Sequence, residues 1–234
     1  MQKLIDIVKD SARLLIDNYM LAVPSAIAML AVFLTQVPLT VGTIGIISLV
    51  IALLNVAAVL VTLVSVDSLN KSKKFDHMKS LNVVIGKIWP LFLLYLLGAA
   101  VWIVIFAVAV VIGILATKLS AVLSALVYVV AVVIWIWILY SRFFFADQIV
   151  LFEGKSPLVA LKRNYSLIKS SQNIAVLYLI FAILVTWVVA LVAGIFPGVL
   201  GAVVAYVLNV AVLVWVAVTI RYFVYKEAVK LSGK

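Results

Sequence analysis

The chain has 234 residues, of which 68% are hydrophobic and 11% are charged, and its formal net charge is +10. Its mean hydropathy of +1.37 is far too high for an ordinary soluble domain. Long apolar runs separated by short polar stretches instead indicate an integral membrane protein. The chain has no cysteine, which excludes disulfides and thiolate chemistry.

Six membrane-spanning helices are predicted within a single membrane domain of residues 1–234. A span needs roughly 20 apolar residues, and short turns separate the two spans of each pair. The first span is the shortest, because Gln36 and Pro38 end it early. The predicted fold class is therefore all-α and polytopic, with three helical hairpins. The expected spans are residues 20–35, 43–66, 89–115, 120–141, 174–194 and 199–221.

A basic segment between the fourth and fifth spans is predicted to form an amphipathic helix that lies on the membrane. Ser156 is a favourable N-cap, and Pro157 suits the first helical position. Apolar side chains follow at spacings of three and four, on one helix face: Leu158, Leu161, Tyr165 and Ile168. The basic side chains expected on the opposite side, as contacts to lipid headgroups, are Lys162, Arg163 and Lys169.

Similar helices are expected before the other two hairpins. The apolar positions are Ile5, Val8, Ala12 and Leu15 in the first helix, and Met78, Leu81, Ile85 and Ile88 in the second. One helix and one hairpin then form a repeat unit, at approximately 1–77, 78–154 and 155–234. Residues 142–155 align without gaps with residues 221–234, and Asn55 aligns with Asn209. Such a repeat is compatible with a pseudo-threefold bundle whose axis runs along the membrane normal.

The basic residues predict the orientation of the chain in the membrane. Of the 18 lysine and arginine residues, 17 fall on one side of the predicted spans, and only Lys118 falls on the other. Cytoplasmic loops carry the basic excess in membrane proteins. The protein is therefore expected to be a multi-pass protein of the cell membrane, with both termini and both long loops in the cytoplasm.

One stretch of the sequence resembles a known family. The residues that carry the resemblance are Glu153, Gly154, Pro157, Ala160, Leu161, Arg163, Leu167 and Lys169, with Asn164-Tyr165 in place of that family's Ser-Trp. In these residues the chain resembles the membrane domain associated with glycerophosphoryl diester phosphodiesterases and its uncharacterised bacterial and archaeal six-span relatives. The resemblance implies a membrane domain with no settled activity, because the phosphodiesterase of some members is a separate soluble domain.

Enzymatic activity is not expected from this sequence. Catalysis needs positioned acids, bases, nucleophiles or metal ligands, and the one histidine, His77, is interpreted as a solvated loop residue. The adjacent Asp76 would point away from His77 on a helix. No motif for binding phosphate is present, and we expect neither a cofactor nor a metal.

Two polar residues lie near the middle of their predicted spans, Asn55 and Asn209. They could form a shared polar site at the membrane midplane, as in a transporter or channel for a small uncharged or lipid-like solute. Hydrogen bonding between helices is the alternative interpretation. A coupled transporter usually carries ionisable residues inside the bilayer, and the predicted spans have none at depth.

The function that the sequence favours is contact between a basic cytoplasmic collar of amphipathic helices and anionic membrane lipid, or a membrane or cytoplasmic protein partner. Orientation in the membrane by itself accounts for much of the basic excess. Attraction to anionic lipid would add roughly 1 kcal/mol for each basic residue near the surface. Nucleic acid is not an expected partner, because the basic residues are spread over several membrane-lying helices.

Overall fold

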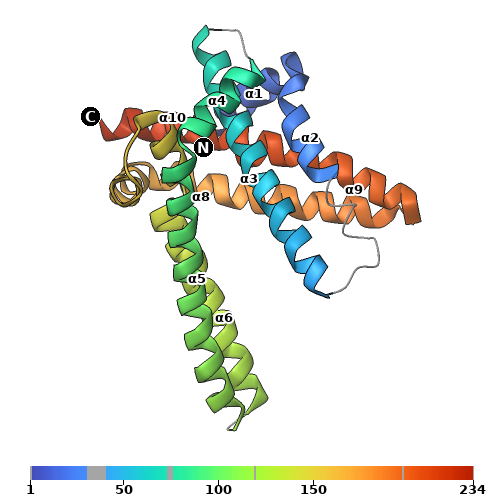
Figure 1. The fold of residues 1–234 in the computed structure, drawn as a ribbon, viewed down its shortest axis with the longest axis vertical. Coiled ribbons are helices and arrows are strands. Elements are labelled where there is room, and N and C mark those ends of the chain that lie inside the picture. The colour runs from blue at the N-terminus through green and yellow to red at the C-terminus, as the bar shows by residue number, and fades with distance from the viewer. Residues whose placement is uncertain (1, 31–40, 73–75, 119, 197, 234) are drawn as a thin grey trace. The chain divides into compact units, whose positions relative to one another are not determined.

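The computed structural model describes residues 2–30, 41–72, 76–118, 120–196 and 198–233, and this part of the chain is all-helical (Figure 1). Among the described residues, five helical stretches are long and apolar enough to cross a membrane: Val50–Lys71, Ile88–Thr117, Ala121–Glu153, Pro157–Val192 and Val203–Ser232. The prediction of an all-α chain with several apolar helices, compatible with a multi-pass membrane protein, is therefore confirmed.

The first predicted span, residues 20–35, differs from the other five. A 3-10 turn, η1 (Tyr19–Ala22), leads into the short helix α2 (Val23–Leu30), and the apolar part of this helical segment covers Tyr19–Ala28. That length is about half of what a span needs. The rest of this predicted span, residues 31–35, lies outside the described residues. The first span, and with it the total of six, therefore stays a prediction.

The chain forms two compact units, Met1–Ile85 with Ser171–Lys234, and Gly86–Ser170. The predicted division into three repeats follows different boundaries, and it stays a prediction.

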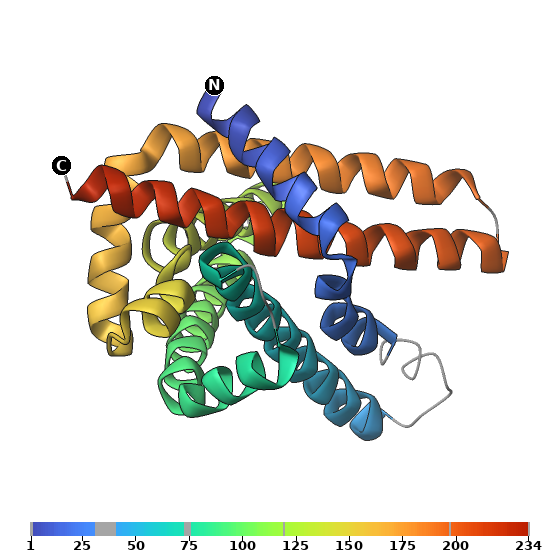
Figure 2. The same cartoon turned by 90° about the horizontal axis from the view of Figure 1, so that it is seen from above.

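The first unit is built from helices at both ends of the chain. Figure 2 shows α9 (Gly198–Val212) and α10 (Arg221–Ser232) continuing one another beside the second half of α8. The segment between them, η5 (Leu213–Ile220), is a π-helix. It packs against α3 (Val41–Ser72) and against α1 (Gln2–Asp17). The remaining helices of this unit are α2, which packs on α3, and α4 (His77–Gly86).

The second unit is organised around α5 (Ile88–Thr117) and α6 (Ala121–Ile138), which run side by side (Figure 1). Ser120 caps α6, because its Oγ accepts the Leu123 N–H at 3.0 Å. Gly113 allows the two helices to approach closely, since a Cβ there would lie 2.8 Å from the Tyr128 ring. After α6 the chain continues through η3 (Leu139–Phe143), α7 (Ala146–Gln148), η4 (Ile149–Glu153) and the first half of α8.

Helix α8 (Pro157–Ile195) begins at the predicted residue and is interrupted at Ser171. There the backbone torsions are φ −121° and ψ 19°, which lie outside the helical region. Residues 157–170 are therefore a helix of their own before the fifth predicted span. The prediction placed this boundary two residues later, near Asn173.

The orientation of residues 157–170 corrects one prediction. The buried face consists of Ala160, Asn164, Leu167 and Ile168. Leu158 and Tyr165 are 64% and 50% exposed, and they share the exposed side with Lys162 and Lys169. The prediction that apolar and basic residues occupy opposite faces is therefore wrong for these positions. The physical reason is that the buried amide of Asn164 has backbone partners on the inner side.

Candidate functional site

In the second unit, the amide of Asn164 bonds to two backbone groups at an interruption of the helix that follows α6. Its Oδ1 accepts the Phe145 N–H at 2.7 Å, and its Nδ2 donates to the Ser141 carbonyl oxygen at 2.9 Å. In an uninterrupted α-helix the Phe145 N–H would donate to the carbonyl of Ser141, four residues earlier. Asn164 therefore takes the place of one missing bond in the helical ladder, a recognised cause of helix kinks.

The break redirects the chain after α6. Phe145 has φ −114° and ψ 7°, and the helix is π-helical on both sides of α7. The segment ends at Gly154, whose φ of +65° is a left-handed conformation that favours glycine. The chain then enters α8 at Pro157, so Asn164 fixes the end of α6 and the start of α8 next to each other.

Six of the seven basic residues of the second unit gather around this break. Arg142 places its guanidinium 4.7 Å from the centre of the Tyr165 ring, and the Arg163 Nε lies 3.7 Å from a carboxylate oxygen of Glu153. The Lys87 side chain lies next to Gly154, because a Cβ built on that glycine would be 3.5 Å from Lys87 Nζ. We call this region the basic end, defined as Lys87, Arg142, Lys155, Lys162, Arg163 and Lys169.

The seventh basic residue, Lys118, follows the last residue of α5 at the opposite end of the α5–α6 pair. Helix α5 has 30 residues, so it separates Lys118 from Lys87 by about 45 Å. That distance exceeds the roughly 30 Å of a bilayer core. The charges of this unit are therefore segregated to the two ends of its longest helices, as predicted from the sequence.

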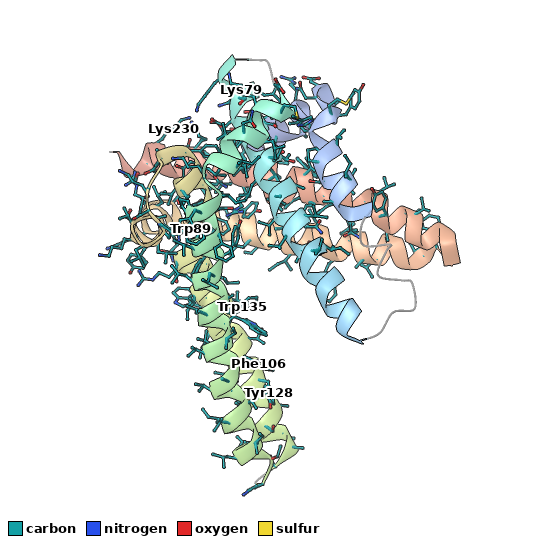
Figure 3. All side chains as sticks on the ribbon, viewed as in Figure 1. Lys79, Trp89, Phe106, Tyr128, Trp135 and Lys230 are labelled. Atoms are coloured by element: carbon teal, nitrogen blue, oxygen red, sulfur yellow. The ribbon has the colours of Figure 1, made fainter. Side chains whose placement is uncertain are left out.

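Exposed apolar side chains accompany the basic end. Leu158 and Tyr165 alternate with Lys162 and Lys169 on α8, and Trp89 is 65% exposed at the start of α5 (Figure 3). Apolar and basic groups mixed on one surface, with a tryptophan at the end of a span, are typical of the membrane–water interface.

Polar residues also anchor the other two predicted amphipathic helices, both in the first unit. On α1, the buried Ser11 Oγ accepts the Trp215 indole N–H at 2.9 Å. On α4, the buried Ser80 Oγ accepts a hydrogen bond from Ser65 Oγ of α3 at 3.0 Å. Each of the three helices therefore buries a polar residue that bonds to another helical segment, and none of the three contacts was predicted from the sequence.

A polar cluster joins α3 and α10 in the first unit. Tyr222 OH donates to Asp67 Oδ1 at 2.8 Å, and Lys71 Nζ lies 2.6 Å from Asp67 Oδ2. Asn70 Nδ2 donates to Tyr222 OH at 3.3 Å. Both oxygens of this largely buried carboxylate have partners, which is the arrangement of a structural contact. The sequence signal for it was an acid at the end of an apolar run.

The two predicted midplane residues bond to their own helices. Asn55 Nδ2 donates to the Ile51 carbonyl at 2.9 Å, and Asn209 Nδ2 donates to the Ala205 carbonyl at 2.7 Å. Asn209 is exposed, and it lines a hollow of about 220 Å³ between the second half of α8 and the α9–η5 segment. The shared midplane site stays a prediction.

Two apolar hollows flank the α5–α6 pair, with volumes of about 170 and 410 Å³. Trp102, Phe106, Tyr128 and Trp135 contribute to the smaller one, and Figure 3 shows the last three along these helices. Both hollows are lined almost entirely by apolar side chains. Tyr128 supplies the only hydroxyl among the residues that line them, and no carboxylate, amine or imidazole lines either hollow.

The single histidine has a local contact. His77 Nε2 lies 3.0 Å from the carbonyl oxygen of Met20. Among the described residues, no group of three or more histidine, aspartate or glutamate side chains is arranged to hold a metal ion.

Comparison of the chain with models of known protein families, with curated proteins and with solved structures gives no match.

Proposed function

We propose that this protein is a non-enzymatic integral membrane protein whose basic cytoplasmic surface binds anionic lipid headgroups. The observation that carries the proposal is the basic end, where six cations accompany two acids, Asp147 and Glu153. Exposed Leu158 and Tyr165 lie among these cations at the level where a span would end. A headgroup would meet the cations while its acyl chains meet the apolar side chains.

The proposal includes a topology. It places six spans in the cell membrane as three hairpins, each after one interfacial helix, with both termini in the cytoplasm. The interfacial helices are α1, α4 and residues 157–170 of α8. This is the arrangement implied by the resemblance to the membrane domain associated with glycerophosphoryl diester phosphodiesterases, and the three-unit repeat belongs to the same proposal.

Lipid is a better partner for the basic end than a protein or a transported solute. A protein interface usually has few lysines at its centre, whereas Lys162 and Lys169 are exposed beside apolar side chains here. Transport of a small uncharged or lipid-like solute, the alternative function, rests on Asn55 and Asn209. Each of these amides donates to its own helix, which gives the alternative less support.

The proposal predicts selective retention of anionic lipid. The full chain would be extracted with its surrounding lipid from membranes of mixed neutral and anionic phospholipid, and the lipid counted by mass spectrometry. We expect anionic lipid to be enriched over the bulk membrane. The enrichment should fall at about 1 M salt, where the screening length drops to about 3 Å.

Two outcomes would contradict this prediction. A retained lipid fraction equal to that of the bulk membrane would show that the basic end has no lipid preference. A protein that co-purifies at a fixed ratio, together with lipid of bulk composition, would favour the protein partner instead.

A further inference from the structure

We propose that the surface around Asn209, on α9 and the second half of α8, is the contact between two copies of this chain in the membrane. Asn209 lies near the middle of the proposed span 199–221, and its side chain is exposed. Thr186, which is also exposed, lines the same hollow of about 220 Å³ from the neighbouring helix. The inference does not depend on lipid binding at the basic end.

The amide of Asn209 has unused hydrogen-bonding capacity. One N–H donates to the Ala205 carbonyl at 2.7 Å. A primary amide has a second N–H and an oxygen that accepts, and within the described residues neither has a partner. Hydrocarbon offers a polar group no hydrogen bond, so an exposed amide at this depth favours association with another polar group.

A second copy supplies the matching group. An amide carries both a donor and an acceptor, so two Asn209 side chains related by a twofold axis can exchange two hydrogen bonds. The hollow beside Asn209 is bordered by Ala182 and Ala217, whose small side chains would let another helix approach closely. A closed pair satisfies both amides without a further partner.

Helices α5 and α6 carry no amide or charged side chain that could pair with Asn209. Residues 88–117 and 121–138 contain no asparagine, glutamine or charged residue. Asn55, the other amide in a proposed span, makes the same bond to its own helix as Asn209 but is only partly exposed. Lipid acyl chains have no hydrogen-bonding group at all, whereas Asn209 of a second copy offers both a donor and an acceptor.

The test counts labelled full-length chains in liposomes over a range of protein-to-lipid ratios. We expect dimers for the unchanged protein and for Asn209→Gln, and dimerisation about tenfold weaker for Asn209→Leu. Asn55→Leu, the matched control, should dimerise like the unchanged protein. An unchanged protein that is monomeric at every ratio, or equal dimerisation of Asn209→Leu, would overturn the proposal.

Crosslinking gives a second readout that does not depend on the folding of Asn209→Leu. Because the chain has no cysteine, single cysteines can be placed on the same helix. Val212 lines the hollow, whereas Val207 is exposed on another side of α9. We expect a short bis-maleimide to join two Val212→Cys chains and to leave Val207→Cys chains unlinked. The reverse pattern would place the contact elsewhere.

Discussion

Replacing Asn164 with leucine is expected to destabilise the protein by about 2–5 kcal/mol. The change leaves the Phe145 N–H and the Ser141 carbonyl without the bonds that they make to Asn164. An unsatisfied buried polar group costs about 1–3 kcal/mol, and two such groups are created here. Leucine branches at the same atom as asparagine, but its Cγ is tetrahedral and its methyl groups can neither accept nor donate a hydrogen bond.

Two variants separate this effect from general damage to the helix. Asn164→Asp can accept the Phe145 N–H but cannot donate to Ser141, so it should also be destabilised. Asn173→Leu changes an exposed asparagine of α8 beyond the interruption at Ser171, and it should leave stability within about 0.5 kcal/mol. Reversible unfolding in detergent or lipid discs measures all three. A loss below about 1 kcal/mol for Asn164→Leu would contradict the role given to its amide.

Neutralising Lys162, Arg163 and Lys169 together with glutamine is expected to weaken binding of anionic lipid by up to about 100-fold. Each basic residue near a membrane surface contributes about 1 kcal/mol of attraction, and about 1.4 kcal/mol corresponds to a tenfold change. The fold should be retained, because Lys162 and Lys169 are exposed. The ion pair of Arg163 with Glu153 is partly exposed and is worth little.

A charge-conserving variant is the matched control. Lys162→Arg, Arg163→Lys and Lys169→Arg keep all three charges while changing the same side chains, so lipid binding should change little. Binding would be measured as the amount of lipid that each variant retains, compared between discs of anionic lipid and discs of neutral lipid. Equal binding by the glutamine variant and the unchanged protein would remove these residues from the site.

Most apolar helices could be predicted from the sequence, because the length of an apolar run reflects the thickness of the bilayer core. Helix α5 begins at Ile88 where residue 89 was predicted, and α6 begins at Ala121 where residue 120 was predicted. The start of α8 at Pro157 was also predicted, since Ser156 and Pro157 carry a local signal for a helix start. Each of these features depends on neighbouring residues alone.

The buried faces of the short helices could not be predicted in the same way. Ser11, Ser80 and Asn164 are polar, so a search for apolar periodicity assigns them to the outer surface. Their partners lie 204, 15 and 19–23 residues away in the chain, and no local pattern reports such contacts. Local sequence patterns therefore predict that these helices form, but they do not predict which face of each helix is buried.

Contact with cytoplasmic anionic lipid requires the basic end to lie on the cytoplasmic side of the membrane. Single cysteines would replace Lys155 or Lys118, and intact cells would be treated with an impermeant thiol reagent. The chain has no cysteine of its own, so only the introduced residue can react. We expect Lys118→Cys to react from outside, and Lys155→Cys to react only after the membrane is opened. Labelling of Lys155→Cys in intact cells would put the basic end outside and contradict the proposed contact with cytoplasmic anionic lipid.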